Sequence, residues 1–338
     1  MAKFLQLRRA GKGFALVGYG SVPLEEAMVI EGVIAEPERL ARGLLAALKH
    51  PANGHITAHS VASGLPQAHL FSRIITLPAM SHEKLSEAVQ WEAQQYIPMP
   101  MTDLYLDFEI VAAIKNDQGE VREYEILLAA APRAIIDSYM KLFEFLKLTP
   151  HSLETTLAAN IRALHPRGSA TEPVMVIDIG SHATDMAIVT DVVRVTTTVN
   201  VGGDSFTQTL MRALKIDEPH AVQIKVSYGI AESGIQSKIL TALQPQLNLF
   251  VNEVKKLVKY HAERGADERT KHVQRLLLTG GISRMPGFAE YLSRQLSLPV
   301  DISSPWGHRG MKLPQGMDEA TATAYTTAFG LAMRGFVE

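Results

Sequence analysis

The residues whose types and spacing most clearly indicate a binding site lie in the segment Val176–Asp185. There an apolar run ends in Asp178 and is followed by Gly180, Ser181 and Thr184. Small residues in a tight turn after a strand leave backbone N–H groups able to face a phosphate, and the carboxylate can position a hydrated Mg²⁺. Asp and Gly are also the ordinary residues of a structural β-turn after a core strand. This segment alone therefore leaves a phosphate-binding turn and a structural turn both open.

A second glycine turn follows another apolar run and comprises Thr279-Gly280-Gly281. Two glycines at the end of a buried strand leave the backbone bare enough for a base or a ribose to lie against it. Between the two turns stands Gly202-Gly203-Asp204, which we expect to begin a helix. The combination of the three motifs is more specific than any one of them.

The histidines give weaker evidence of a functional site than the glycine turns do. His55 and His59 have the i,i+4 spacing of a helical zinc pair, but their segment has the pattern of a strand, in which residues four apart lie about 13 Å apart. We therefore expect no metal site there. His182 lies inside the first glycine turn and is expected to face solvent. The sequence shows no arrangement of Ser, His and Asp that indicates a catalytic triad.

Composition excludes several classes of protein. The 338 residues leave room for two lobes, and 46% hydrophobic with 20% charged residues is a globular composition. A net charge of -2 argues against an obligate nucleic-acid partner or a polybasic membrane tether. The absence of cysteine excludes disulfides, Fe–S clusters and thiol nucleophiles. No signal peptide or membrane-spanning run is legible, so we expect a cytoplasmic chain that reaches a membrane only through partners.

Periodicity predicts the elements that must position these residues. The strands expected before the first glycine turn are 4–7 and 14–20 as a hairpin, 55–61, 104–113 and 121–131, and the helices are 37–50, 82–96, 133–146 and 149–164. Residues 165–169 are expected to form an interdomain linker. Further along, the expected strands are 174–179, 274–278 and one near residue 300, with a hairpin over 185–200. The expected helices are 203–214, 288–296 and 319–335, within mostly helical sequence from 203 to 264. The apolar series from Leu247 to Val258 is expected to be core.

The glycine motifs resemble the phosphate-2 and adenosine motifs of the actin, Hsp70 and sugar-kinase superfamily. The matching residues are Asp178-Ile179-Gly180 with Thr184, then Gly202-Gly203-Asp204, then Gly280-Gly281 with Pro286-Gly287. Within this superfamily the segment 88–100, followed by Leu106-Asp107-Phe108, resembles one branch, the FtsA-related PilM family of type IV pilus assembly proteins. This segment is the specific part, because unrelated kinases share the glycine motifs.

The resemblance implies an α/β fold of the actin-like ATPase type, with two lobes and an inserted 1C-type subdomain. The implied divisions are lobe 1 at 1–73 (subdomain 1A, without its phosphate-1 strand), the 1C-like insertion at 74–148, a return to lobe 1 with a linker at 149–172, lobe 2 at 173–310 with a 2B insertion at about 205–270, and a return to lobe 1 at 311–338.

An inter-lobe cleft holding ATP and Mg²⁺ follows from the same resemblance. The implied cofactor-binding residues are Asp178, Gly180, Ser181, Thr184, Gly202, Gly203, Asp204, Lys225, Gly280, Gly281 and Arg284, with Asp178 reaching Mg²⁺ through water. At most a slow ATPase is expected, with nucleotide acting as a conformational ligand.

Two departures from the family pattern bear on the cofactor. The family's Asp-Ile-Gly phosphate-1 motif precedes the strand that begins here at Ala2, so half of the phosphate clamp is missing from this sequence. The sequence is then either a shortened form or a natural variant, and ATP binding is expected to be weakened. Beside Lys225, where the family usually carries an acidic residue, stand Val222 and Gln223, which puts the ribose contacts in doubt.

The resemblance also implies a scaffold role. The partners implied for this chain are the N-terminal cytoplasmic peptide of PilN, other platform proteins and the motor ATPases of the pilus. Whether the chain also associates with itself is left open by the resemblance. The expected peptide-binding residues are Leu77, Tyr96, Ile97, Pro98, Met99 and Met101. Trp91 is expected to pin its helix to the neighbouring strands. Two alternatives stay open, a phosphotransferase of the sugar-kinase type and a scaffold without nucleotide.

Overall fold

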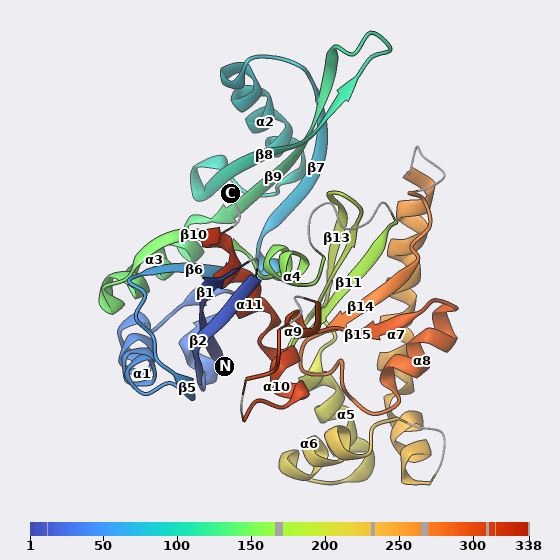
Figure 1. Cartoon of the computed structure of the whole chain (residues 1–338). Coiled ribbons are helices and arrows are strands. Elements are labelled where there is room, and N and C mark those ends of the chain that lie inside the picture. Colours follow the sequence, from blue (N-terminus) through green and yellow to red (C-terminus); the bar gives the residue numbers. More distant parts are fainter. Residues whose placement is uncertain are drawn as a thin grey trace. The chain divides into compact units, whose positions relative to one another are not determined.

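The computed structural model describes residues 1–11, 13–165, 172–230, 234–264, 270–308, 311–314 and 316–336. The chain forms two compact units (Figure 1). Unit 1 comprises Met1–Arg8, Leu16–Thr156 and Arg334–Glu338, and unit 2 comprises Arg9–Ala15 and Leu157–Met333. Both units are mixed α/β. The subdomain names expected from the sequence stay a prediction.

Unit 1 begins with the expected hairpin, of which the residues Arg9–Ala15 are assigned to unit 2. In chain order its main elements are β1 (Ala2–Ala10), β2 (Gly13–Val22), β3 (Val29–Ile30), β4 (Val33–Ile34), α1 (Pro37–Lys49), β5 (Asn53–Gly54), β6 (Ser60–Leu65), β7 (Phe71–Pro78), α2 (His82–Tyr96), β8 (Leu104–Lys115), β9 (Val121–Pro132), α3 (Arg133–Leu146) and β10 (Thr149–Thr155). Strands β1, β2 and β5 form one sheet in that order. Helices α1 and α3 share an apolar core that includes Leu40, Leu142 and Phe143.

A separate helix-on-sheet module follows within unit 1. The antiparallel sheet has the order β7-β9-β8, and α2 buries Leu85, Val89 and Ala93 against it. These three residues are spaced four apart, so they form one stripe along the helix. Ile126 and Leu128 of the central strand β9 complete the core. The helix expected at 82–96 and the strands expected at 104–113 and 121–131 are therefore confirmed here.

Two expected elements in unit 1 are wrong in part. The strand expected at 55–61 begins only at Ser60, so the strand-based distance argument for His55 and His59 does not apply. The first half of the helix expected at 149–164 is the strand β10, which pairs in parallel with β6. Threonine and proline in this stretch disfavour a helix. The backbone hydrogen bonds of β10 are made with β6, which lies far from it in the sequence.

Unit 2 is built around a five-stranded sheet with the order β13-β12-β11-β14-β15. Its elements are α4 (Thr156–Leu164), β11 (Val174–Ile179), β12 (Thr184–Val189), β13 (Val193–Val199), α5 (Gly203–Leu214), α6 (Glu218–Ser227), α7 (Ile235–Arg264), β14 (Arg275–Thr279), α8 (Phe288–Leu296), β15 (Val300–Ile302), α9 (Pro305–His308), α10 (Glu319–Ala324) and α11 (Thr326–Met333). The central strand β11 runs antiparallel to β12 and parallel to β14.

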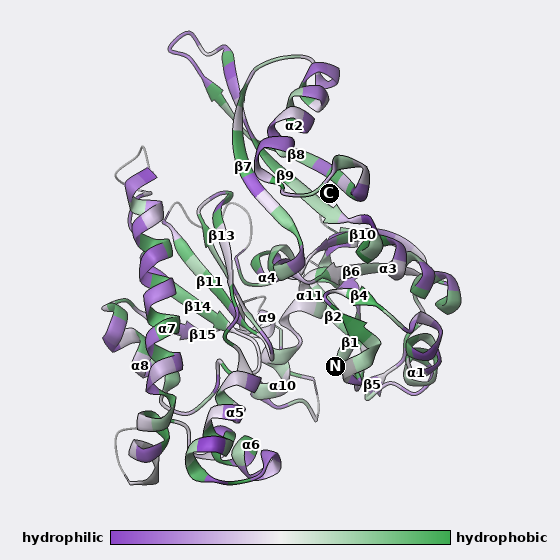
Figure 2. Ribbon diagram, turned by 180° about the vertical axis from the view of Figure 1, so that it is seen from behind, coloured by the Kyte–Doolittle hydropathy of each residue, from purple (hydrophilic) through white to green (hydrophobic). Residues whose placement is uncertain are grey.

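Helices cover this sheet with a large apolar core. Phe206 of α5, Phe250 of α7 and Phe288 of α8 are fully buried, and the rings of Phe206 and Phe250 each form a T-shaped contact with the ring of Phe288. Figure 2 shows the corresponding pattern, with β11 and β14 mostly hydrophobic and α7 banded in hydrophilic and hydrophobic turns. Leu247 and Val254 are also fully buried, so the expectation that the series 247–258 is core is confirmed.

The C-terminal part of unit 2 differs from the expected single helix at 319–335. Tyr325, with φ -100 and ψ 8, separates α10 from α11. Helix α11 packs closely on α4, since a Cβ placed on Gly330 would lie 1.9 Å from the carbonyl oxygen of Ala159. His165, expected to open a linker, is buried, and its Nε2 lies 3.0 Å from the carbonyl oxygen of Thr190. The rest of that expected linker, 166–169, lies outside the described residues.

Candidate functional site

The two glycine turns lie side by side at one end of the unit 2 sheet. In the parallel pairing of β11 with β14, Asp178 stands opposite Thr279. Asp178-Ile179-Gly180 and Thr279-Gly280-Gly281 are therefore neighbours at the carboxyl ends of their strands. Ligands of open α/β sheets bind at this end of the strands. The structure thus brings together two motifs that are about 100 residues apart in the sequence.

The first turn joins β11 to β12. The amide of Gly180 donates to the carbonyl of Ala183 at 3.0 Å, and the hydroxyl of Thr184 donates to the carbonyl of Val201 at 2.6 Å. Thr184 is fully buried, so its side chain stabilises the turn from the protein interior and does not face a ligand. Among the described residues, the structure gives no acceptor for the backbone amides of Ser181, His182 and Ala183. Three donors in one exposed turn suit an anion.

Helix α5 begins beside this turn and holds it in place. The amide of Gly203 donates to the carbonyl of Gly180 at 3.0 Å, and the amide of Asp204 donates to that of Ser181 at 2.8 Å. A Cβ on Gly202 would lie 2.5 Å from the Ser181 carbonyl oxygen, so only glycine permits this approach. The amides of Gly203 and Asp204, two residues that the resemblance assigned to the cofactor, are thus used to fix the turn.

His182 closes the outer side of the turn. Its Nδ1 lies 2.9 Å from Oδ2 of Asp204, and its side chain is 88% exposed. The expectation that His182 faces solvent is confirmed.

Asp178 lies at the base of the site and is half-buried. Its Oδ2 accepts a hydrogen bond of 2.7 Å from Nδ2 of Asn160 on α4. A Cβ on Gly280 would lie 2.5 Å from its Oδ1, and Gly280 has a φ of +87°. The carboxylate therefore lies directly against the second glycine turn, where it can reach a hydrated cation.

Lys225 on α6 is buried, and its Nζ donates to the carbonyl of Gly203 at 2.9 Å and to Oγ1 of Thr207 at 2.7 Å. Burial lowers the pKa of Lys225, while the charges of Asp204 and Glu218 act in the opposite direction. The family resemblance assigned this lysine to the cofactor. In the structure it ties α6 to the beginning of α5.

Arg284, the other assigned cation, follows the second glycine turn. Its Nε donates to Oγ1 of Thr323 at 2.9 Å, and its guanidinium pairs with Glu319 at 2.7 Å. Both partners belong to α10, whose first turn is capped by Asp318. Arg284 therefore anchors α10 next to the site.

Sequence reasoning missed Asn160 and the residues of α10 and α11. Thr279 donates to Oγ1 of Thr326 at 2.7 Å, and Thr327 donates to Oδ1 of Asn160 at 2.9 Å. Each contact joins residues far apart in the sequence, so no local pattern signals them. The one hint in the sequence is an asparagine among the otherwise apolar residues on the buried face of α4.

The residues expected to bind a peptide divide into two groups. Leu77 and Ile97 are buried in the core of the module formed by β7, β8, β9 and α2, and Met99 and Met101 pack against that core. Pro98 is exposed.

The two aromatic residues of α2 are exposed. Tyr96 is half-exposed and lies under the guanidinium of Arg73, 4.0 Å from the ring centre. Trp91 is 71% exposed, so the interpretation that it pins its helix to the neighbouring strands is wrong.

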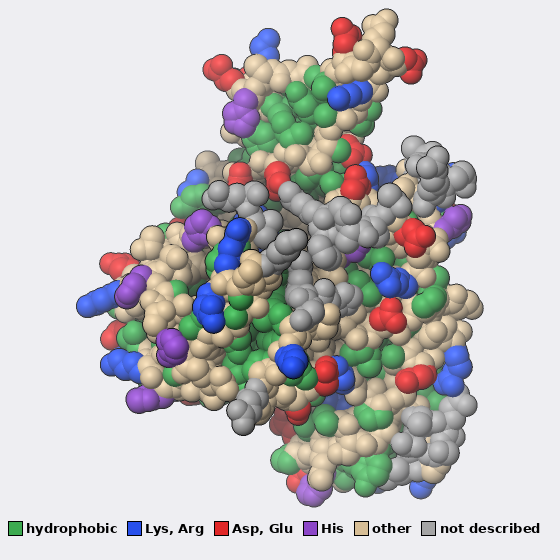
Figure 3. Space-filling view, viewed as in Figure 1, with side chains coloured by type: hydrophobic (Ala, Val, Ile, Leu, Met, Phe, Trp, Pro, Cys, Tyr) green, Lys and Arg blue, Asp and Glu red, His purple; other side chains and the backbone are tan. Residues whose placement is uncertain are grey.

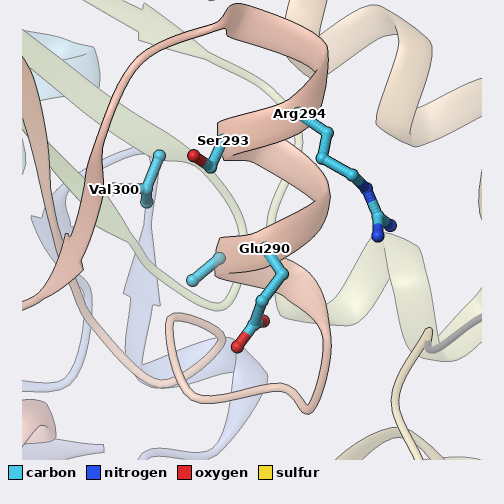
Figure 4. A pocket seen from close by; sticks show the side chains of 5 residues that line it. Glu290, Ser293, Arg294 and Val300 are labelled. Carbon is cyan, nitrogen blue, oxygen red and sulfur yellow. The ribbon is translucent and has the colours of Figure 1, made fainter.

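A hollow elsewhere on unit 2 does not add to this site. It has a volume of about 340 Å³ and is lined by Ala289, Glu290, Ser293, Arg294 and Val300 (Figure 4). Val300 pairs with Leu276, at the end of β14 opposite the glycine turn. Within the described ranges, no cluster of three or more acidic, histidine or cysteine side chains could bind a metal ion, and no helix combines the length and hydropathy needed to span a bilayer.

The fold is that of the actin-like ATPases. The solved structure of a PilM-PilN type IV pilus biogenesis complex matches with a TM-score of 0.83 at 23% identity, over 99% of this chain and 96% of that chain. MreB 5 of Spiroplasma citri bound to AMPPNP matches with a TM-score of 0.50 at 12% identity, over 98% and 95% of the two chains. The expected fold class is confirmed.

The family model for type IV pilus assembly protein PilM matches residues 1–336, and the chain belongs to this family. Curated relatives include the cell division protein FtsA of Neisseria meningitidis serogroup B, 26% identical over 179 residues, and that of Pseudomonas aeruginosa, 27% identical over 180 residues. These matches cover 47% and 48% of this chain and only 41% and 42% of the relatives. The chain thus matches about two fifths of their length.

Proposed function

We propose that the chain is an assembly scaffold of the type IV pilus machinery that binds the N-terminal cytoplasmic peptide of PilN, with Mg²⁺ and ATP as conformational ligands. Membership in the PilM family, over residues 1–336, is the observation that carries the scaffold role. A PilM-PilN complex with the same fold supports PilN as the partner. Contact with the membrane, with other platform proteins and with motor ATPases would then follow through this assembly.

The nucleotide part of the proposal rests on the first glycine turn and on Asp178. The turn offers three backbone donors to phosphate oxygens, and Asp178 lies at the base of the site with one oxygen toward Gly280. A carboxylate at this place suits the hydration shell of Mg²⁺. These residues therefore fit the group that the fold family implies.

Replacing Asp178 with asparagine tests this role. The substitution preserves size and one acceptor oxygen but removes the negative charge, so most of the Mg²⁺-dependent gain in ATP affinity should be lost. Calorimetric titration with ATP in Mg²⁺ and in EDTA measures this difference. Asp191→Asn is the matched control, because that carboxylate lies at the turn between β12 and β13 and accepts from Thr190. A wild-type chain that binds no ATP would instead establish a nucleotide-free scaffold.

The peptide part of the proposal rests on the exposed face of the helix-on-sheet module. Figure 3 shows hydrophobic side chains gathered on the surface over α2 and the β7-β9-β8 sheet. Trp91 and Tyr96 are the large aromatic residues that α2 leaves exposed. Exposed aromatic side chains of this size are typical binding anchors. We therefore move the centre of the proposed peptide site from Met99 and Met101 to these two residues.

Trp91→Ala is expected to weaken binding of a synthetic PilN N-terminal peptide by about 2 kcal/mol and to leave the melting temperature nearly unchanged. The reason is that the side chain is mostly in water and contributes little to the core. The double variant Met99→Ser with Met101→Ser is the control, and it is expected to lower the free energy of unfolding by about 2 kcal/mol. If the double variant instead loses affinity at an unchanged melting temperature, while Trp91→Ala binds normally, the loop at 97–101 is the site.

A further inference from the structure

Asn160 forms a buried bridge between the candidate cation site and α11, the last α-helix of unit 2. It lies on α4 with no exposed surface. Its Nδ2 donates to Oδ2 of Asp178 at 2.7 Å, and its Oδ1 accepts from the hydroxyl of Thr327 on α11 at 2.9 Å. Three elements, β11, α4 and α11, therefore meet through one amide side chain.

We infer that Asn160 is a positioning residue that orients the Asp178 carboxylate for a cation, and that Thr327 fixes the orientation of Asn160. This inference rests on the proposed nucleotide function, since it names what prepares that site. An ionised carboxylate only accepts hydrogen bonds, so the NH₂ end of Asn160 must face Asp178. The carbonyl end must then face Thr327, whose hydroxyl donates to it. Each contact determines the other.

Fixing Asp178 Oδ2 also determines where its second oxygen lies. Oδ1 is directed toward Gly280, whose missing side chain leaves space for it. The plane of the carboxylate is therefore held between α4 and the second glycine turn. Hydrogen bonds to an ionised group are stronger than neutral ones, so this orientation resists thermal motion.

The helix that carries Thr327 is itself tightly joined to α4. Nη1 of Arg162 donates to the carbonyl of Gly330 at 2.9 Å, and Gly330 lies against the backbone of Ala159. The neighbouring Thr326 accepts from Thr279 at the base of the second glycine turn. Helix α11 therefore reaches both strand ends of the site, and a shift of α11 would reorient Asp178.

Two measurements test the inference. In the first, Mg²⁺-dependent ATP affinity is compared with affinity in EDTA. Asn160→Ala should weaken the Mg²⁺-dependent binding about tenfold, which corresponds to about 1.4 kcal/mol, and change binding in EDTA less than twofold. Thr327→Val should weaken it about threefold, and Thr327→Ser should restore it. Thr241→Val is the matched control, because Thr241 is exposed and its hydroxyl donates to the backbone carbonyl of Ser237 in its own helix, away from Asp178 in the sequence and on another element.

The second measurement uses the chain without nucleotide. A double-mutant cycle of Asp178→Ala and Thr327→Val, followed by denaturant unfolding, should show a coupling of about fivefold in the unfolding equilibrium constant. The coupling should vanish in an Asn160→Ala background. Absence of coupling in the wild-type background overturns the positioning role itself. A coupled wild-type chain that binds no ATP in Mg²⁺ overturns the proposed nucleotide function and the assignment of a cation to Asp178, so the two failures are distinguishable.

Discussion

Replacing Gly330 with alanine is expected to destabilise unit 2 by about 3 kcal/mol or to prevent its folding. The added Cβ would lie 1.9 Å from the carbonyl oxygen of Ala159 and 2.5 Å from its carbonyl carbon. Both obstructing atoms belong to the backbone of α4, so no side-chain rotation relieves the clash. Helices α4 and α11 would have to separate, and the bond from Arg162 to the Gly330 carbonyl would be lost.

Equilibrium unfolding of Gly330→Ala and Gly335→Ala provides the comparison. Gly335 follows α11, and among the described residues a Cβ added to it would meet no atom within 4 Å beyond its chain neighbours, so its replacement should leave the unfolding free energy within about 0.5 kcal/mol. Equal stability of the two variants would show that α11 does not pack on α4 as described.

Local periodicity was sufficient to predict most elements. The helices at 133–146 and 288–296 have the predicted bounds, because an apolar stripe with helical spacing identifies a helix without knowledge of its partner. The strand β10 was missed for the opposite reason. Its backbone hydrogen bonds come from β6, a segment that no short window of sequence contains.

The candidate site was predictable where a turn dictates residue type. Asp178 and Gly280 stand where the chain must turn sharply after a buried strand, so the residue types themselves carry the signal. Asn160 and Thr327 could not be found this way, because they are 167 residues apart and meet only after folding. Lys225 was assigned to the cofactor by the family resemblance alone, and in the structure its partners are the backbone and hydroxyl groups of α5.

The position of Trp91 could have been predicted from the sequence. The buried stripe of α2 is Leu85, Val89 and Ala93, and Trp91 is two residues from Val89, on the opposite side of a helix with 3.6 residues per turn. Tryptophan as a residue type suggested a buried position in the core. The position of Trp91 relative to the buried stripe of the helix indicated instead that its side chain faces solvent. In this module the phase of the stripe was the better guide.

Replacing Gly280 with alanine is expected to remove Mg²⁺-dependent ATP binding and to destabilise the chain by about 2–4 kcal/mol. Gly280 has a φ of +87°, a backbone conformation that residues with a Cβ rarely adopt. The new Cβ would also lie 2.4 Å from the carbonyl oxygen of Ile179 and 2.5 Å from Oδ1 of Asp178. The turn can accommodate alanine only by moving away from β11 and by displacing the carboxylate.

Gly281→Ala is a closely matched control for this variant. Gly281 is the next residue in the same turn and its φ lies outside the positive region. In the part of the chain that the structure describes, no atom beyond its chain neighbours lies within 4 Å of a Cβ placed there. Thermal unfolding and ATP titration in Mg²⁺ should therefore separate the two neighbours, with the loss confined to position 280. If both variants bind ATP as the wild type does, the second glycine turn does not border the cation site. If both lose binding at unchanged stability, the bare backbone at 281 itself contacts the nucleotide, as the sequence motif suggests.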